Sequence, residues 1–452
     1  MSSQRLLHRL LATLVLGLLL AGCATAPTVT HEPPPPQRNT VLVEAEALAA
    51  NDATLTGAAR QANATAIARL LAGLDDAALQ RAADDTAAEA PLYNFLGQAL
   101  LARGLRVPKP FVRSDWRLDT SARPPAAADG YRPPLRVGLL LPLSGALANT
   151  AVPVRDGFLA GYHGESRSRP DIQFYDTAGG VAAAYARAVA EGVDYVIGPL
   201  ARAEVDALFA QPALQVPVLV LNRGNRRPPS ASVAFSLAPE DEGIAAAEYM
   251  FSRGARHVLV VAGGDDTLRR TADAFREAFH ARGGQIVASL PEGTADFGAH
   301  AAAETPPDAV FLALRAASAA EVVPRLAVAG LGDRLRVGTS QIAGVEAAEA
   351  MGLDGIVFPT ESWSVRNVPG LPSAAILGAS LASARGPAAR LFAFGFDAWR
   401  LAAYLEHLAQ DPNARLDGAT GQLGIDGFGN VTRRPAWSSF RGGVAVPLPD
   451  SR

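Results

Sequence analysis

The sequence predicts an α/β protein in which two lobes of parallel sheet, flanked by helices, follow a small all-helical module. From Leu135 onward, short apolar runs alternate with helical patterns. This alternation favours parallel strands joined by right-handed helical crossovers. About ten such runs are present, more than one small sheet holds, so we expect two lobes. Between Val41 and Leu105, apolar residues recur at spacings of three and four, which is typical of helices.

The composition and the motifs argue against several classes of function. The chain has 452 residues, is 49% hydrophobic and carries a formal net charge of -3. It therefore lacks the basic excess typical of nucleic-acid binding, and we expect no nucleic-acid partner. It contains no Walker A sequence, no G-x-G-x-x-G after Arg136 and no G-x-S-x-G around Ser144. The seven histidines show no zinc spacing, so we expect no metal, no cofactor and no catalytic residues.

The N-terminus predicts a lipoprotein signal. Arg5 and Arg9 precede an uncharged run from Leu10 to Leu20, which is shorter than a bilayer-spanning helix. Leu-Ala-Gly-Cys follows and resembles a bacterial lipobox, so we expect residues 1–22 to be removed and Cys23 to be lipidated. An ordinary signal peptide with a chance cysteine is the alternative. Ala24 stands where an aspartate would signal inner-membrane retention, which points by resemblance to the outer membrane.

Four segments follow the signal. Residues 23–40, with four successive prolines, are expected to be a semi-rigid tether. Residues 41–105 are predicted to be helical, with Gly104 as a helix stop. Residues 106–134 contain six prolines and are interpreted as a linker. Residues 135–446 are expected to form the two-lobed domain.

Ten runs in that domain are strand candidates, and two long stripes are helix candidates. The helix candidates span 267–282 and 390–407. The string GQLGIDGFGNV is typical of a hairpin, with Gly427 and Gly429 at the turn. The strand candidates are 136–143, 172–177, 195–200, 216–222, 233–237, 257–263, 284–290, 308–314, 334–340 and 355–360.

Polar and small residues gather where the first four strands end. Ligands of open α/β sheets bind outside the carboxyl ends of the strands, so these residues are candidates for lining a cleft. A serine with free backbone N–H groups suits a carboxylate or another small anion. The alternative is that the side chains only cap helices and turns. The candidates are Ser144, Gly145, Asp176, Thr177, Gly198 and Asn222.

Several strings together resemble a known family. VGLLLPLSGALANTAVPVRDGFLAGY resembles the opening of type I periplasmic binding proteins, as do YVIGPL and VPVLVLN. The string from Arg155 to Ala160, together with the lipobox, is similar to the LppC/LpoA lipoproteins. RLFAFGFDAWRLA and GQLGIDGFGNVTRRPAWSSFRGG also resemble that family. The resemblance extends from Leu135 to about Val446.

The resemblance implies a function without catalysis. Proteins of this family are lipid-anchored at the outer membrane and activate a bifunctional class A penicillin-binding protein, which is therefore the expected partner. Well-studied members carry a large N-terminal domain of helical repeats, whereas only about 65 residues occupy that place here. Two alternatives remain: a receptor for an amino acid or small anion, using Ser144, Thr177 and Asn222, and a cell-wall hydrolase.

Overall fold

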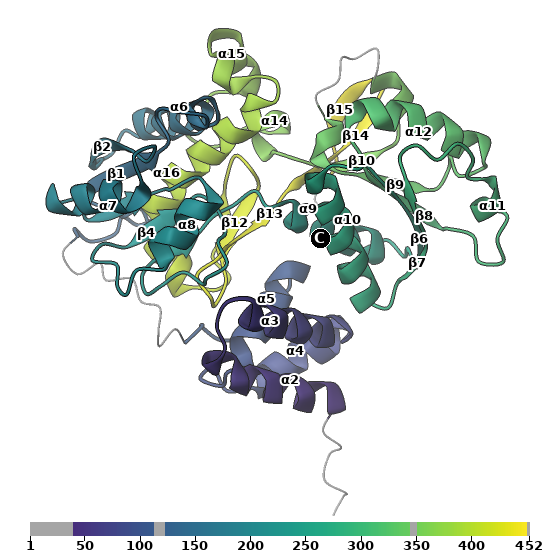
Figure 1. Ribbon diagram of the computed structural model, residues 1–452, viewed down its shortest axis with the longest axis horizontal. Coiled ribbons are helices and arrows are strands. Elements are labelled where there is room, and N and C mark those ends of the chain that lie inside the picture. The colour runs from purple at the N-terminus through teal and green to yellow at the C-terminus, as the bar shows by residue number, and fades with distance from the viewer. Residues whose placement is uncertain (1–38, 113–122, 344–349, 450–452) are drawn as a thin grey trace, which may run out of the picture. The chain divides into compact units, whose positions relative to one another are not determined.

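Two separate sheets carry most of the strands, and helices cover both faces of each sheet in the computed structural model (Figure 1). The structure describes residues 39–112, 123–343 and 350–449. Of these, the residues from Val41 onward belong to one compact unit. Cys23 lies outside the described residues.

The described chain begins with a bundle of short helices, as predicted for this segment. Apolar side chains at helical spacing, such as Ile67, Leu71 and Leu96, form its core. Asp75 caps the third helix by accepting a 2.7 Å hydrogen bond from the Ala78 N–H. Gly104 ends the fourth helix with a left-handed φ of 72°. The helices are α2 (Thr40–Asn51), α3 (Gly57–Ala72), α4 (Asp76–Asp85) and α5 (Tyr93–Arg103), with a 3₁₀ turn at Asp52–Thr54.

The first sheet has five parallel strands in the order β2-β1-β3-β4-β5. Its interior strand β1 is apolar on both faces because helices pack on both. The Leu139 side chain lies on the face that α6 and α16 cover, whereas the Leu140 side chain lies on the face that α7 and α8 cover. The strands are β1 (Arg136–Leu141), β2 (Asp171–Asp176), β3 (Tyr195–Ile197), β4 (Val218–Val220) and β5 (Val233–Ala234). The helices are α6 (Ala148–Gly164), α7 (Val181–Ala190), α8 (Arg202–Phe209) and α16 (Ala388–Gln410).

The second sheet has seven strands in the order β15-β14-β10-β9-β8-β6-β7. Five are parallel, and the last two strands of the chain add to one edge in antiparallel orientation. Helices α9 and α10 cover one face and α12 covers the other. The strands are β6 (His257–Ala262), β7 (Gln285–Pro291), β8 (Ala309–Ala313), β9 (Leu335–Gly338), β10 (Val357–Thr360), β14 (Ala436–Arg441) and β15 (Val444–Pro447). The helices are α9 (Pro239–Ser252), α10 (Asp266–Ala281), α11 (Gly298–Ala301) and α12 (Ala316–Val328).

A third, small sheet contains the predicted hairpin. Strands β12 and β13 are antiparallel, and Gly429 in their turn has a φ of 82°. Asp426 holds the turn by accepting hydrogen bonds from the N–H groups of Phe428 and Asn430 at 2.9 and 2.8 Å. The strands are β11 (Leu416–Asp417), β12 (Gln422–Ile425) and β13 (Val431–Arg434), and the short helices α14 (Ser362–Val365) and α15 (Ala374–Ser380) precede α16.

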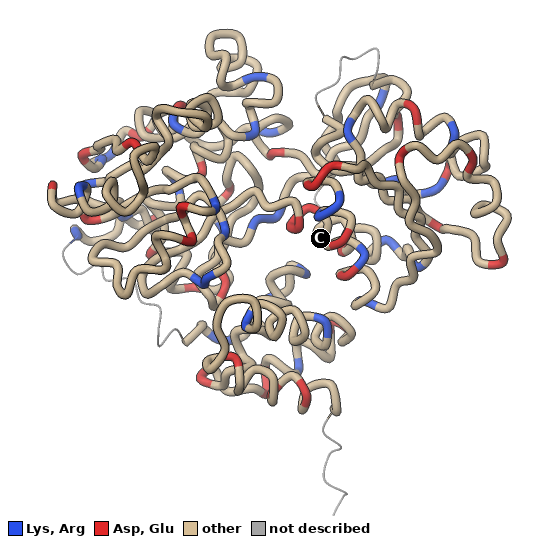
Figure 2. The backbone as a smooth tube through the Cα atoms, viewed as in Figure 1, with Lys and Arg blue, Asp and Glu red and all other residues tan. Residues whose placement is uncertain are grey.

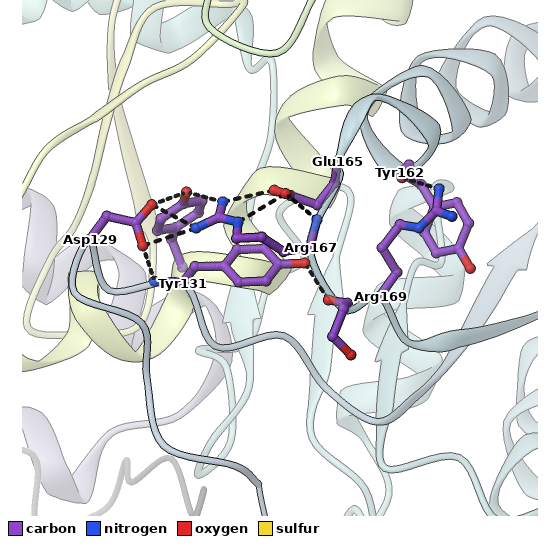
Figure 3. Close-up of polar contacts among 8 residues, drawn as sticks. Asp129, Tyr131, Tyr162, Glu165, Arg167 and Arg169 are labelled. Carbon is purple, nitrogen blue, oxygen red and sulfur yellow. Dashed lines mark hydrogen bonds and ion pairs between the residues drawn. The ribbon is translucent and has the colours of Figure 1, made fainter.

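Arg167, in the first sheet region, binds the C-terminal part of the linker (Figure 3). Arg167 contacts Asp129 at 2.8 Å and Glu165 at 2.8 Å, and its guanidinium lies 3.7 Å from the ring centroid of Tyr131. The Tyr131 hydroxyl donates a 2.8 Å hydrogen bond to the Ser168 carbonyl. The linker therefore wraps onto the sheet domain over these residues.

The charged residues of both signs are interspersed along the described chain (Figure 2). Long helices such as α16 carry charges at several positions, including Arg390, Asp397 and Arg400. Within the described ranges, no helix combines the length and the apolar character needed to cross a bilayer.

Candidate functional site

The carboxyl edge of the five-stranded sheet brings two of the predicted residues together. Ser144 follows β1, Asp176 ends the neighbouring strand β2, and the Ser144 hydroxyl donates a 2.5 Å hydrogen bond to Asp176 Oδ2. The N–H groups of Leu143 and Ala178 donate to Asp176 Oδ1 at 2.9 and 3.0 Å. The bond from Ser144 is the main reason that the pKa of Asp176 is lowered. The carboxylate therefore stays ionised and ties the two loops together.

Ser144 does not cap the helix that follows it. Helix α6 begins at Ala148, and its N-cap residue Leu147 supplies no side-chain bond. Gly145 has a φ of 76°, which provides the left-handed turn between the strand and the helix. Ser144 and Gly145 thus shape the loop.

Gly198 and Asn222 also serve the geometry of the edge. A Cβ on Gly198 would lie 2.0 Å from the Leu140 carbonyl oxygen, so β3 approaches β1 at a distance that only glycine allows. Asn222 donates to the Leu200 carbonyl at 3.0 Å and accepts from the Arg223 N–H at 2.9 Å. Both ends of its amide are therefore engaged by the backbone.

Thr177 differs from these residues. It is buried, and its hydroxyl oxygen has no hydrogen-bond partner within the described part of the chain. A buried hydroxyl without a partner costs free energy, so it is a feature that a bound polar group would relieve. Of the three residues that a small-molecule receptor would use, Ser144 and Asn222 are engaged by the protein itself, and Thr177 retains an unused group.

The carboxyl edge of the seven-stranded sheet holds a buried ion cluster that the sequence did not reveal. Glu242 lies in the first turn of α9, and Arg390 lies in the first turn of α16. Arg390 Nη2 donates to Glu242 Oε1 at 2.5 Å, and its Nε lies 3.2 Å from Glu361 Oε1. Ser340, just after β9, donates its hydroxyl and its N–H to Glu242 at 2.7 and 3.1 Å, and Arg390 also contacts the Ser340 hydroxyl.

The charges of this cluster compensate one another. Burial by itself raises the pKa of Glu242, but Arg390, Arg433 and the bonds from Ser340 outweigh burial, and the net pKa is lowered. Burial lowers the pKa of Arg433, and the like charge of Arg390 adds to that effect. Glu242 is therefore ionised, and it depends on Arg390 because it is only 5% exposed.

The cluster connects the two sheet regions. Helix α16 packs on α6 over the first sheet, whereas Ser340 and Glu361 follow strands of the second sheet. The guanidinium of Arg390 thus occupies the strand ends at which open α/β sheets bind ligands. No distinctive spacing marks these residues in the sequence, because Glu242 reads as one of three acidic residues at a helix start. The arrangement can hold the two regions together.

Two cavities of the described chain lie beside the first sheet, one at the opposite ends of its strands and one near the carboxyl ends of β4 and β5. One, of about 200 Å³, is at the opposite ends of β1 and β2 and includes Arg136 and Asp171. The other, of about 500 Å³, lies beside helix α3 and the loop after β4. Among the described residues, no group of three or more His, Cys, Asp or Glu side chains is arranged to hold a metal.

Two α/β sheets, each covered by helices on both faces, place the chain in the class of type I periplasmic-binding-protein-like folds. A solved protein of Chromobacterium violaceum, described as a "putative branched-chain amino acid ABC transporter", matches 68% of this chain and all of its own with a TM-score of 0.55 and 30% identity. The family model "LppC putative lipoprotein" matches residues 131–291 and 295–443. The chain belongs to the LppC family.

Relatives with established names lie within this family. The penicillin-binding protein activator LpoA of Haemophilus influenzae is 28% identical over 333 residues, which are 69% of this chain and 55% of that protein. The solved C-domain of H. influenzae LpoA, described as a regulator of PBP1A, matches 70% of this chain and all of its own with a TM-score of 0.61 and 25% identity. This chain spans about half the length of the curated relatives that it matches.

Proposed function

We infer that this chain is a lipid-anchored regulator of peptidoglycan synthesis, which binds and activates a bifunctional class A penicillin-binding protein from the periplasmic side of the outer membrane. The family match over residues 131–443 carries this proposal, because the curated relatives within it are named as activators of penicillin-binding proteins. Lipidation at Cys23 supplies the anchor. The protein itself acts as a binding partner and not as an enzyme.

The geometry of the two strand edges supports a binding role without a closing cleft. Asp176 and Asn222 hold loops of the first edge, and Arg390 fills the second edge. A receptor that closes on a solute needs such groups free for the ligand. The same fold used as a rigid body presents its outer surface to another protein.

The test uses soluble protein that begins at residue 24 and the purified class A synthases of the same organism. We expect a complex and faster glycan polymerisation and cross-linking. A fragment of residues 24–134 is the matched control and should neither bind nor accelerate. The proposal is wrong if no class A synthase binds the protein, or if the fragment binds as well as the whole.

The second candidate is a receptor for an amino acid or small anion in the first edge. The unused hydroxyl of Thr177 and the fold shared with the C. violaceum transporter protein support it. A ligand bound there raises the melting temperature, because binding to the folded state stabilises it. A thermal-shift screen of amino acids, repeated with Thr177→Val, decides: a stabilisation that the variant loses would establish the receptor.

A further inference from the structure

A cavity of about 500 Å³ lies between the start of helix α3 and the loop that follows strand β4. Its volume falls in the range of ~300–1,000 Å³ that is usual for small-ligand pockets. The lining residues include four arginines and no aspartate or glutamate, and Asn225 and Asn430 also line the cavity. The arginines are Arg60, Arg223, Arg226 and Arg227.

Two of these arginines share one carboxylate. Arg60 Nε lies 3.1 Å and Arg227 Nη1 lies 2.6 Å from Oδ2 of Asp52. Burial is the main reason that the pKa of Arg227 is lowered, and the neighbouring Arg60 adds to this effect against Asp52. A single negative charge thus faces two guanidiniums, which leaves a positive charge on this wall of the cavity.

Of the other two arginines, Arg223 is compensated by carboxylates, chiefly Asp241, which raise its pKa, whereas Arg226 has no such partner among the described residues. Arg223 Nη1 lies 2.8 Å from Asp241, but its Nε is buried and has no hydrogen-bond partner among the described residues. Arg226 is exposed, and no described residue forms an ion pair or hydrogen bond with it. The four arginines therefore face two directly paired carboxylates.

Two further carboxylates accept hydrogen bonds from the lining residues Asn225 and Asn430. Asp206 accepts hydrogen bonds from the backbone and side-chain N–H groups of Asn225 at 2.5 and 2.9 Å. Asp426 accepts from the backbone and side chain of Asn430 at 2.8 and 3.0 Å. Their charges weaken the field of the arginines, although neither carboxylate belongs to a residue that lines the cavity.

Helix α3 adds donors to the same cavity. Its first residue Gly57 and its N-cap Thr56 both line the space. Thr56 makes no side-chain capping bond, and the first turn contains no acidic residue; its basic residue is Arg60. A positive residue at the positive end of a helix is unfavourable unless an anion is nearby. The start of helix α3 thus favours an anion in this cavity, as the arginines do independently.

We propose that this cavity binds a small organic or inorganic anion with at least two negatively charged oxygen groups, either carboxylates or phosphates. Guanidiniums match both groups through paired N–H donors, and their charge-assisted bonds are stronger than neutral ones. The ligand would be held by Arg60 of helix α3 and by Arg226 of the loop after β4, and it would join these two elements. This inference is independent of the function proposed above, since it uses none of Asp176, Thr177, Asn222 and Arg390.

The test measures binding of citrate and of pyrophosphate by isothermal titration calorimetry, with soluble protein from residue 24 at low ionic strength. The two anions distinguish a carboxylate ligand from a phosphate ligand. The variants are Arg226→Gln and Arg60→Gln. The matched control is Arg385→Gln, because Arg385 is exposed, precedes α16 and does not line the cavity. Circular dichroism confirms that each variant is folded.

We expect at least one anion to bind, and we expect each cavity variant to weaken it by ~10-fold, which is the effect of losing one charge-assisted bond of about 1.4 kcal/mol. The control should bind within about twofold of the unaltered protein. The proposal is overturned if neither anion binds with a Kd below ~1 mM, or if Arg385→Gln weakens binding as much as Arg226→Gln.

Discussion

Two glycines in the family strings are explained by a close crossing of helices α6 and α16. A Cβ on Gly157 would lie 1.8 Å from the Phe392 carbonyl oxygen, and a Cβ on Gly395 would lie 1.9 Å from that of Val154. Each glycine therefore allows the opposite backbone to approach. The glycines in the strings that resemble the LppC/LpoA proteins are thus required for helix packing. This requirement accounts for a glycine in the middle of each helix despite its poor helix propensity.

We expect Gly157→Ala to destabilise the protein by ~3 kcal/mol or more, because the added methyl group overlaps backbone atoms that cannot move without separating the helices. Gly264→Ala is the matched control, since nothing lies within 4 Å of its added Cβ. Urea unfolding measures both variants. Equal stability of the two would show that the crossing is looser than the structure indicates.

Asp397, also in a family string, is fully buried and holds the loop before β12. Its carboxylate accepts hydrogen bonds from the Ala419 N–H at 2.6 Å and from the Thr420 N–H and hydroxyl at 2.7 and 2.6 Å. Burial outweighs these bonds and raises the pKa of Asp397 to about 6. The folded state therefore binds a proton more tightly than the unfolded state, in which the pKa is ~3.9.

This difference predicts a pH dependence with a definite sign. The protonated carboxyl stabilises the fold below pH ~4, and that stabilisation is lost as the pH rises through about 6. The difference between the folded and unfolded pKa values corresponds to ~3 kcal/mol in the free energy of unfolding. Asparagine does not titrate, so the stability of the unaltered protein minus that of Asp397→Asn should fall by most of this amount between pH 4 and pH 7. Urea unfolding at both values measures it, and a difference that does not change with pH would contradict the assignment.

At the scale of the elements, the strands were largely predictable and two features were not. Each of the ten predicted runs contains a strand, because strands covered on both faces are continuous apolar stretches. Strands β14 and β15 were missed, because AWSSFR mixes polar and apolar residues at the edge of a sheet. Helix α16 was predicted, but not that it returns to the first sheet, since pairing between distant segments leaves no local pattern.

The candidate site was predictable to a similar degree. The strand ends could be located from the sequence, and Ser144 does meet Asp176. The ion cluster of Arg390 could not be located, because its members come from α9, α16 and the ends of two strands. Charged residues at helix starts are common, and only the fold shows which of them are buried.

The Arg390 cluster predicts a large loss of stability when one partner is removed. Arg390→Gln leaves Glu242 buried without its ion-pair partner, which should cost ~3–5 kcal/mol. The control Arg385→Gln should change the free energy of unfolding by less than ~0.5 kcal/mol. Adding Glu242→Gln to Arg390→Gln should restore part of the loss, because the buried charge is then gone. Urea unfolding of the four proteins tests this, and no recovery in the double variant would mean that Arg390 acts through packing alone.

At the scale of the whole molecule, the helical module is part of the same compact unit as the sheets. Phe428, in the hairpin turn, packs 4.7 Å from the Phe95 ring, and Gln98 donates to Asp426 at 2.8 Å. On another side of the module, Arg69 pairs with Glu277 of α10 at 2.8 Å. A module of about 65 residues buries little surface alone. These contacts supply the packing that the sequence left undecided.

The proposed lipid anchor gives the last prediction. Exchanging residues 1–23 for a cleavable signal peptide without a lipid site should move the protein from the membrane fraction to the soluble periplasm, because stable anchoring needs more than one acyl chain and all of them are expected at Cys23. The matched control, Ala24→Asp, keeps Cys23 but should shift the protein to inner-membrane density. Fractionation on a sucrose gradient measures both. An exchanged protein that stays with outer membranes would mean that a surface of the body, and not Cys23, binds it there.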